Sequence, residues 1–414
     1  MTVLFIVGTT LALGATGLVL VCFAGLPLQA VPQLMYNSAN AYALTAIPLF
    51  MLMGAIVERA GMGKHMIDFA SSLVGWMRGG LAHVNTVVSF LFAGMNGSSG
   101  ADVASMGPIL IPEMKRKGYP VNFAAAITSS TSDAAILIPP SITLIVYGVL
   151  ANVSITRMFL AGIVPGIVLM LAYMALSHFF AVKHQWPVHE TFDVKQVGPA
   201  TRRAGPALLI PLIIMGGILG GIFTATEAAA VAVFTATLIV LVFYRNVSLG
   251  DAYEILLVTA KRTGMVMMIV AASGILAWYL SNRQIPQQMA VSLLEFTDNY
   301  YAITLIVSAF LIMLGTMING VPAMIILVPV LLPIMTAIEM DPIHFGIIFA
   351  LATTVGSQTP PVASTMLLTC AIAGISISEM WKMNRWFILV NVIVMLLVAM
   401  IPVFSLWLPA AILD

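Results

Sequence analysis

The chain has 414 residues, of which 61% are hydrophobic and only 8% are charged, and its mean hydropathy is +1.06. This composition is typical of an all-α polytopic membrane protein and excludes a water-soluble globular domain. The formal net charge of +1 gives no support to nucleic-acid binding, and the two cysteines, Cys22 and Cys370, lie in separate apolar stretches without the spacing of a metal or redox site.

Apolar segments follow one another along the chain. Met1 to Ala24 carries no charge and is long enough to cross about 30 Å of hydrocarbon. It has neither a basic leader nor a convincing cleavage site, so we do not expect a removable signal peptide. Further apolar elements are expected at 39–57, 84–95, 101–112, 121–150, 158–181, 206–222, 226–243, 264–281, 301–318, 321–338, 343–374 and 386–411.

Two of these elements, 84–95 and 101–112, are too short to span a membrane alone. They flank the turn Asn96-Gly97-Ser98-Ser99-Gly100, which is rich in glycine and serine. A pair of short helices around such a tip indicates a re-entrant hairpin. Backbone of this kind is tolerated at membrane depth only where protein buries it or where it lines a wet cavity.

Each of two long apolar segments is interrupted by a proline pair, Pro139-Pro140 in the first and Pro360-Pro361 in the second. A proline lacks an amide hydrogen and blocks a helical hydrogen bond, so the preceding turn exposes free carbonyl groups. In hydrocarbon such carbonyls are costly unless something occupies them. The natural occupant is a cation.

The two halves of the chain repeat one another at an offset of 221 (360 minus 139) or 222 (342 minus 120) residues. Five prolines match at nearly constant offset, which is far less common by chance than matches of Ala or Leu. The matched pairs are Pro108 with Pro329, Pro112 with Pro333, Pro120 with Pro342, Pro139 with Pro360 and Pro140 with Pro361. We therefore expect an internal repeat, and its second half contains a second hairpin around Asn319-Gly320.

Charge indicates that the repeat is inverted. Lys115-Arg116-Lys117 follows the first hairpin, whereas Glu339-Met340-Asp341 follows the second. Because cytoplasmic loops gather Lys and Arg, these two loops belong on opposite sides of the membrane. With 115–117 inside, counting the crossings also puts the basic loops 182–205 and 245–262 inside.

The expected organisation has six parts. They are N-terminal scaffold and arm helices (1–83), the first repeat with its hairpin and break (84–181), a cytoplasmic connector (182–205), scaffold and arm helices of the second half (206–300), the second repeat with its hairpin and break (301–385), and a C-terminal transmembrane helix (386–414).

Inverted repeats with broken helices that meet near the midplane are the layout of secondary transporters. Both hairpin tips and both breaks offer uncharged oxygen ligands, which suit an alkali cation better than a transition metal. Helix N-termini at the same tips can accept an anionic substrate. The structural alternative is that Ser and Gly at the tips only permit tight helix packing.

Several motifs resemble the large membrane subunit of TRAP (tripartite ATP-independent periplasmic) transporters over essentially the whole chain. They are Gly79-Gly80-Leu81-Ala82-His83, Gly118-Tyr119-Pro120, Pro139-Pro140-Ser141-Ile142, Gly221-Ile222-Phe223-Thr224-Ala225-Thr226-Glu227-Ala228 and Thr359-Pro360-Pro361-Val362. The resemblance implies a sodium-coupled symporter of the elevator type in a bacterial inner membrane. It also implies two partners, a small membrane subunit and a periplasmic binding protein that delivers a small organic acid.

Carried over from the family, two sodium sites are expected. One comprises Ala93, Asn96, Ala135, Ile138 and Pro140, and the other comprises Gly315, Gly356, Thr359 and Val362. Many of these residues would bind through backbone carbonyls. The substrate is expected between the hairpin tips, near Ser98, Ser99 and Asn319.

The chain departs from the family pattern at both breaks. Asp133 stands where small polar or apolar residues are commoner, and Ser357-Gln358 adds polarity before the second proline pair. Because an intramembrane carboxylate is a candidate functional residue, we add Asp133 and Gln358 to the substrate site. The alternative for Asp133 is a carboxylate satisfied by Ser130 and Thr131. Asp102 could contact the substrate but is expected to cap a hairpin helix, and for Glu227 a helix-start or structural role is expected rather than substrate contact.

Three other classes of protein compete with this interpretation. A stand-alone sodium- or proton-coupled carrier of the divalent-anion type would share the inverted repeats and hairpins. A membrane enzyme is not expected, because no paired aspartates and no Ser/His motif are placed for catalysis in the apolar segments. A channel would need a continuous hydrated path.

Overall fold

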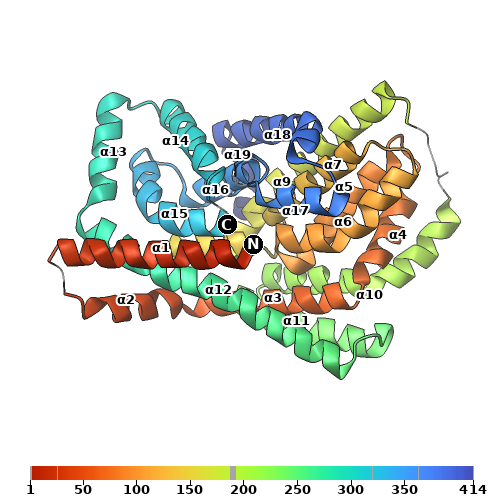
Figure 1. Cartoon of the computed structure of the whole chain (residues 1–414), viewed down its shortest axis with the longest axis horizontal. Coiled ribbons are helices and arrows are strands. Elements are labelled where there is room, and N and C mark those ends of the chain that lie inside the picture. Colours follow the sequence, from red (N-terminus) through yellow and green to blue (C-terminus); the bar gives the residue numbers. More distant parts are fainter. Residues whose placement is uncertain (1, 26, 187–192, 319, 362, 414) are drawn as a thin grey trace.

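The computed structural model describes residues 2–25, 27–186, 193–318, 320–361 and 363–413, and these ranges contain helices and loops but no strand (Figure 1). Seven of the helices are long and apolar enough to cross a membrane, and α7 with α8, bent by 40° at a short break, would make an eighth span. The expected all-α multi-pass fold is therefore confirmed.

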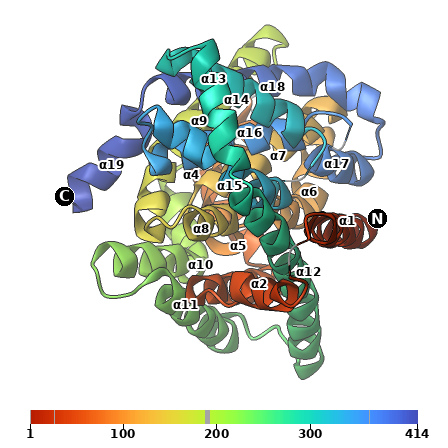
Figure 2. The same ribbon diagram turned by 90° about the vertical axis from the view of Figure 1, so that its left-hand side faces the viewer.

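The helices of the first part of the chain pack against helices from its middle. These elements are α1 (Thr2–Phe23), α2 (Ala30–Ala39), η1 (Tyr42–Thr45), α3 (Ala46–Arg59), α4 (Met62–Val74), α10 (Val194–Leu219), α11 (Ala225–Ile239), η3 (Val240–Tyr244), α12 (Leu249–Asn282) and α13 (Ile285–Phe296). The long α12 runs diagonally across the lower part of the molecule in Figure 1 and packs against α1, α2 and α3 (Figures 1 and 2).

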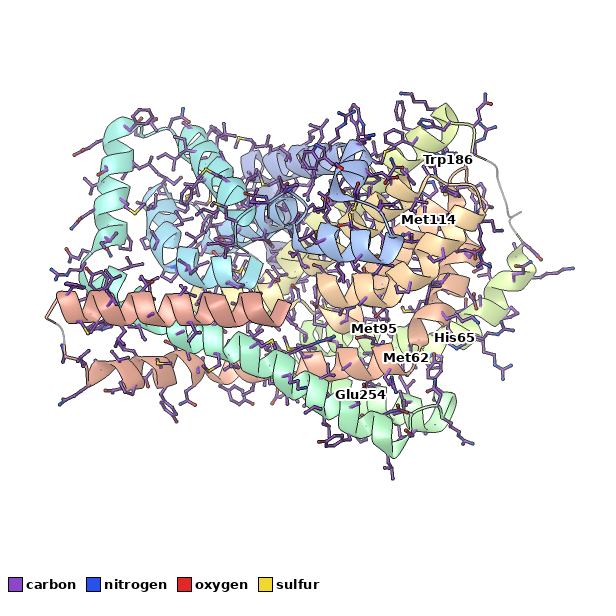
Figure 3. All side chains as sticks on the ribbon, in the orientation of Figure 1. Met62, His65, Met95, Met114, Trp186 and Glu254 are labelled. Carbon is purple, nitrogen blue, oxygen red and sulfur yellow. The ribbon has the colours of Figure 1, made fainter. Side chains whose placement is uncertain are left out.

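Glycines let α12 approach its neighbours closely. A Cβ atom on Gly274 would lie 1.9 Å from the Ser38 hydroxyl oxygen of α2, and one on Gly17 of α1 would lie 3.0 Å from Ile275. Backbone contact of this kind is how membrane helices gain packing energy, since lipid supplies no hydrophobic drive between them. At the other end of α12, Arg59 of α3 forms ion pairs with Asp251 and with Glu254 (3.4 Å). Glu254 is labelled near the lower end of this helix in Figure 3.

The two repeats have the same order of elements. The first contains α5 (Gly80–Asn96), α6 (Ser99–Arg116), α7 (Val121–Ala134), η2 (Ala135–Leu137), α8 (Ile142–Leu150) and α9 (Ile155–Lys183). The second contains α14 (Tyr300–Gly315), α15 (Gly320–Ala337), α16 (Pro342–Ser357), α17 (Ser364–Ala373) and α18 (Ile377–Met400), and α19 (Val403–Leu413) follows it. In each repeat a helical hairpin precedes a broken helix and then a long helix.

The repeats interlock through matching contacts. Helix α6 of the first hairpin packs against α17, the second half of the other repeat's broken helix. Its counterpart α15 packs against α8 in the same way. Helices α7 and α16 are buried almost throughout, and their contacts with α18 and α9 also correspond. Both breaks and both hairpins thus belong to one packed body. Inversion of the repeats relative to a bilayer stays a prediction.

Several boundaries differ from those expected. The polar connector expected at 182–205 is helical at both ends, because α9 continues to Lys183 and α10 begins at Val194, where Asp193 accepts a hydrogen bond from the Lys195 amide (2.9 Å). The single C-terminal helix expected at 386–414 is two helices, since α18 ends at Met400, next to Ile401-Pro402. Helices α2, α4 and α13 were not expected from the apolar pattern.

Candidate functional site

The tip of the first hairpin lies directly against the first break. Gly97 has φ of 59°, and a Cβ atom there would lie 2.9 Å from the Pro140 carbonyl oxygen. Only glycine fits this combination of left-handed backbone and close approach without strain. Three groups of the first expected sodium site, Ala93 and Asn96 in the tip and Pro140 in the break, therefore come from adjoining segments. The Pro139-Pro140 peptide bond is cis.

The carbonyl groups in this region use only part of their capacity to accept hydrogen bonds. The Ala93 carbonyl accepts from the Gly97 amide (3.1 Å), and the Ala135 carbonyl accepts from the Ile138 amide (3.0 Å). Asn96 Oδ1 accepts from the Ser98 amide (3.2 Å), whereas Asn96 Nδ2 is buried without a hydrogen-bond partner. A carbonyl oxygen has two lone pairs, so each of these acceptors keeps capacity for a further ligand.

The second tip and the second break are in still closer contact. A Cβ atom on Gly356 would lie 2.3 Å from the Gly315 carbonyl carbon, so the backbones of α14 and α16 touch at these two residues. The Thr359 hydroxyl donates to the Val355 carbonyl (2.8 Å), and the Pro360-Pro361 bond is cis as in the first break. Val362 and Asn319, which were also assigned to the site, lie outside the described residues.

Asp133 connects the two halves of the site. Its carboxylate, 2% exposed, accepts a hydrogen bond from the Thr365 hydroxyl of α17 (2.5 Å). Its other side-chain neighbours are Ser99 in the first hairpin tip, and Ser357 and Gln358 at the second break. One carboxylate of the first broken helix thus has neighbours in a tip of its own repeat and at the break of the other repeat.

Gln358 lies at the centre of a second group of hydrogen bonds. Its side-chain oxygen accepts from the Ser130 hydroxyl of α7 (2.8 Å), and its backbone carbonyl accepts from Asn384 Nδ2 of α18 (3.2 Å). The Tyr173 hydroxyl of α9 is a further neighbour. Gln358 is fully buried, and these bonds satisfy its side-chain oxygen and its backbone carbonyl, whereas its Nε2 has no hydrogen-bond partner.

Ser130 and Thr131, the neighbours expected to satisfy Asp133, have other partners. Ser130 bonds to Gln358, and the Thr131 hydroxyl donates to the Ile127 carbonyl of its own helix (2.9 Å). The expectation for Asp102 was also wrong, because no side-chain cap is formed at the start of α6. Instead the fully buried Asp102 carboxylate accepts from the Ser132 hydroxyl (2.6 Å) and ties the first hairpin to α7.

Glu227 does lie at a helix start, as expected. Its carboxylate accepts from the Thr224 amide (2.8 Å) while the Thr224 hydroxyl accepts from the Glu227 amide (3.3 Å), which closes a capping box at α11. No group of three or more His, Cys, Asp or Glu side chains that could hold a metal occurs within the described ranges.

The two breaks differ in exposure. Pro139 and Pro140 are buried, whereas Pro360 and Pro361 are exposed and Thr359 is partly exposed. Ser98 in the first tip is exposed, and Ser99 and Ser357 are partly exposed. The surface of the chain therefore reaches the site at the first tip and the second break, one side chain away from Asp133.

Three residues of this site were missed by the sequence reasoning: Thr365, Asn384 and Tyr173. Asn384 could have been found, because a polar amide inside an apolar helix is a candidate functional residue. Thr365 and Tyr173 gave no comparable signal, since a single hydroxyl in a membrane helix commonly bonds to its own backbone.

Comparisons with known proteins agree with this architecture. Residues 1–404 match the family model described as "Tripartite ATP-independent periplasmic transporter, DctM component". The sialic acid TRAP transporter large permease protein SiaM of Vibrio cholerae is 34% identical over 91% of this chain and 88% of its own length. The C4-dicarboxylate TRAP transporter large permease protein DctM of Pseudomonas aeruginosa is 34% identical over 96% of this chain and 93% of its own length.

A solved structure has the same fold. The YdaH transporter of Alcanivorax borkumensis superposes with a TM-score of 0.67 over 98% of this chain and 99% of its own, at 13% sequence identity. The similar sequences are those of transporter permeases and not of enzymes. The chain therefore belongs to the family of DctM components of tripartite ATP-independent periplasmic transporters and is a multi-pass protein of the inner membrane.

Proposed function

We propose that the chain carries out sodium-coupled uptake of a small organic acid by an elevator mechanism. The observation that carries the proposal is the pairing of each hairpin tip with a proline break in its own repeat, Gly97 on Pro140 and Gly315 on Gly356. At each pairing, uncharged backbone and side-chain oxygens converge, in a buried region at the first break and in a partly exposed one at the second. Such oxygens bind an alkali cation weakly enough to release it, which a coupling ion requires.

The proposed substrate class, a small organic acid, is supported by the names of the relatives and by the chemistry of the hairpin tips. One relative carries sialic acid and another carries C4-dicarboxylates by their names, and both are organic acids. In this chain Ser99 begins α6 beside the site, so free amide groups at the start of that helix are available to a carboxylate. Ser98, Ser99 and Gln358 supply further hydrogen-bonding groups in the same region.

Coupling between the ions and the acid needs no separate device. If sodium orders a hairpin tip against its break, the ordered tip binds the acid more tightly, and by linkage the acid must increase sodium affinity by the same factor. Each sodium that moves inward releases about 2.3 kcal/mol per 100 mV of membrane potential. The gradient can therefore drive accumulation of the acid.

The elevator mechanism is supported by how the helices pack. The two hairpins and the two broken helices interlock as one body, through α6 with α17 and α8 with α15. Helices α1 and α2 both pack against α12, which also contacts α15, and we infer that these three helices form the layer against which the body moves. A small membrane subunit would extend that layer, and a periplasmic binding protein would deliver the acid to the hairpin tips.

Reconstitution into proteoliposomes tests the proposal. The permease would be combined with its small membrane subunit and binding protein, and uptake of organic acids, including sialic acid and succinate, would be followed with an inward gradient of sodium, lithium, potassium or protons. We expect uptake only with sodium and only with the binding protein. Uptake without sodium would refute the coupling, and uptake of free acid by the permease alone would favour the stand-alone carrier.

A further inference from the structure

We propose that Asp133 and Gln358 form a recognition pair for a hydroxyl group, so that the carried acid bears a hydroxyl and a second carboxylate is rejected at this position. The inference deepens the proposed uptake of an organic acid and rests on it. It concerns two of the residues by which the breaks are expected to depart from the family pattern. Their side chains are neighbours, and the Thr365 hydroxyl bonds both to Asp133 and to the Ser357 carbonyl next to Gln358.

The Asp133 carboxylate is an acceptor in neutral surroundings. Its side-chain neighbours, Thr365, Ser357, Ser99 and Gln358, are all uncharged. None of the ion pairs within the described ranges involves it. A carboxylate has about four acceptor positions, and a buried one gains stability from each donor that reaches it.

An alcohol already occupies one of these positions. The Thr365 hydroxyl donates to Asp133 Oδ2 at 2.5 Å and lies 3.0 Å from the Ser357 carbonyl. This contact shows which donor chemistry the surroundings of the carboxylate accommodate, namely a neutral O–H group on carbon.

Gln358 supplies the complementary donor. Its Oε1 is taken by Ser130, but its Nε2 is buried and forms no hydrogen bond of normal geometry. Asp133 and Tyr173 are close enough to interact with the Gln358 side chain without completing such a bond. An unsatisfied donor therefore lies beside an acceptor with spare capacity.

A hydroxyl group matches this pair better than the alternatives do. It can donate to Asp133 while it accepts from Gln358 Nε2, which satisfies both side chains at once. An ammonium group has no acceptor for Gln358. A carboxylate would accept from Gln358 but would be repelled by the ionised form of Asp133, because the low dielectric of a buried site does little to screen two like charges.

The pair is buried but lies close to the surface that was described for the site. Ser99 and Ser357, which both contact Asp133, are partly exposed, and Ser98 is exposed. A small displacement of the first hairpin tip from the second break would open the carboxylate to an incoming hydroxyl. The acid's carboxylate would then lie at the start of α6.

Binding measurements on the purified complex of permease and small subunit test the inference. Three pairs of acids that differ by hydroxyl groups serve as probes: glycerate and propionate, tartrate and succinate, gluconate and hexanoate. Affinities are read from thermal unfolding shifts in sodium chloride, without the binding protein. We expect at least one hydroxy acid to bind about 10- to 100-fold more tightly than its partner, as for one or two hydrogen bonds to a charged group.

Variants of the permease then test whether Asp133 and Gln358 produce the hydroxyl preference. Asp133→Asn should reduce this preference to threefold or less and should strengthen succinate binding, and Gln358→Leu should weaken hydroxy acids alone. Asp68→Asn, the same change at an exposed position, serves as the control and should change neither. If Asp133→Asn does not fold, Gln358→Leu decides the question by itself.

The result that overturns the inference is a wild-type complex with no hydroxyl preference, whether it binds both members of every pair or neither. An unchanged preference in the variants overturns it equally. Repeating the measurement in potassium chloride separates the two proposals. A hydroxyl preference that needs no sodium would contradict sodium coupling only, whereas sodium-dependent binding without that preference would contradict the hydroxyl pair only.

Discussion

The hydroxyl of Thr365 donates to the carboxylate of Asp133, and this one bond joins α17 of the second repeat to the end of α7 in the first. Thr365 also lies 3.0 Å from the Ser357 carbonyl at the second break. The two breaks are therefore held together by a side-chain contact as well as by helix packing. A buried carboxylate depends on such donors, because it has no water to replace them.

Replacing Thr365 by Val should destabilise the protein measurably. The change keeps the shape of the side chain but leaves the carboxylate short of one donor, at a cost of about 1.5–3 kcal/mol. Thermal unfolding of the purified permease measures this cost. Thr365→Ser should restore most of the stability. Thr369→Val is the matched control, since the Thr369 hydroxyl bonds to the Thr365 carbonyl of its own helix (2.7 Å). An equal loss of stability in Thr369→Val would contradict a special role for the bond to Asp133.

Gly356→Ala should separate the second hairpin from its break. The new Cβ atom would lie 2.3 Å from the Gly315 carbonyl carbon, and backbone cannot move aside as a flexible side chain can. Overpacking of this kind costs about 1–3 kcal/mol and should abolish sodium-dependent uptake. Gly264→Ala, where nothing lies within 4 Å of the new atom, should leave both unfolding and uptake unchanged. Normal sodium-dependent uptake by Gly356→Ala would mean that the contact is not part of the ion site.

The hairpins and the breaks could be predicted from the sequence because glycine and proline act locally. Gly97 and the two proline pairs determine backbone conformation wherever they stand, and the repeated prolines revealed the second hairpin through the first. The shorter helices α2, α4 and α13 were missed because they are short or carry polar residues, so they do not resemble spans. The first part of α12 was missed for a similar reason, since Lys261 and Arg262 interrupt its apolar pattern.

Contacts across the site could not be predicted in the same way. Thr365 is 232 positions from Asp133, and Ser130 is 228 positions from Gln358, so no local pattern connects them. Sequence reasoning singled out Asp133 and Gln358 as departures from the family but gave Asp133 the wrong partners, because neighbours in sequence were the only candidates. Ser130 and Asp133, three positions apart on a buried helix, both face the second repeat, where Ser130 bonds to Gln358 and Asp133 bonds to Thr365.

Gly274→Ala tests the close approach of α12 and α2. The added atom would lie 1.9 Å from the Ser38 hydroxyl oxygen and 2.7 Å from its Cβ, so the helices must move apart. We expect a lower unfolding temperature for the single variant. In a double-mutant cycle with Ser38→Gly, the two changes should couple by about 0.5–3 kcal/mol, because the second removes the atoms with which the first collides. Additive effects would show that the helices do not approach so closely.

Replacing Thr359 by Ala tests the second sodium site most directly. The Thr359 hydroxyl bonds back to the Val355 carbonyl (2.8 Å) at a partly exposed position, so losing it should cost little stability. If the hydroxyl oxygen binds sodium, the sodium concentration that gives half-maximal uptake should rise about tenfold or more, while expression and unfolding temperature change little. Thr336→Ala removes a hydroxyl that bonds back to the Leu332 carbonyl (3.1 Å) in the same way, at an exposed position on α15, and should not change the sodium dependence. An unchanged sodium response in Thr359→Ala would remove this residue from the site, and an equal change in both variants would point to general effects of losing a threonine hydroxyl.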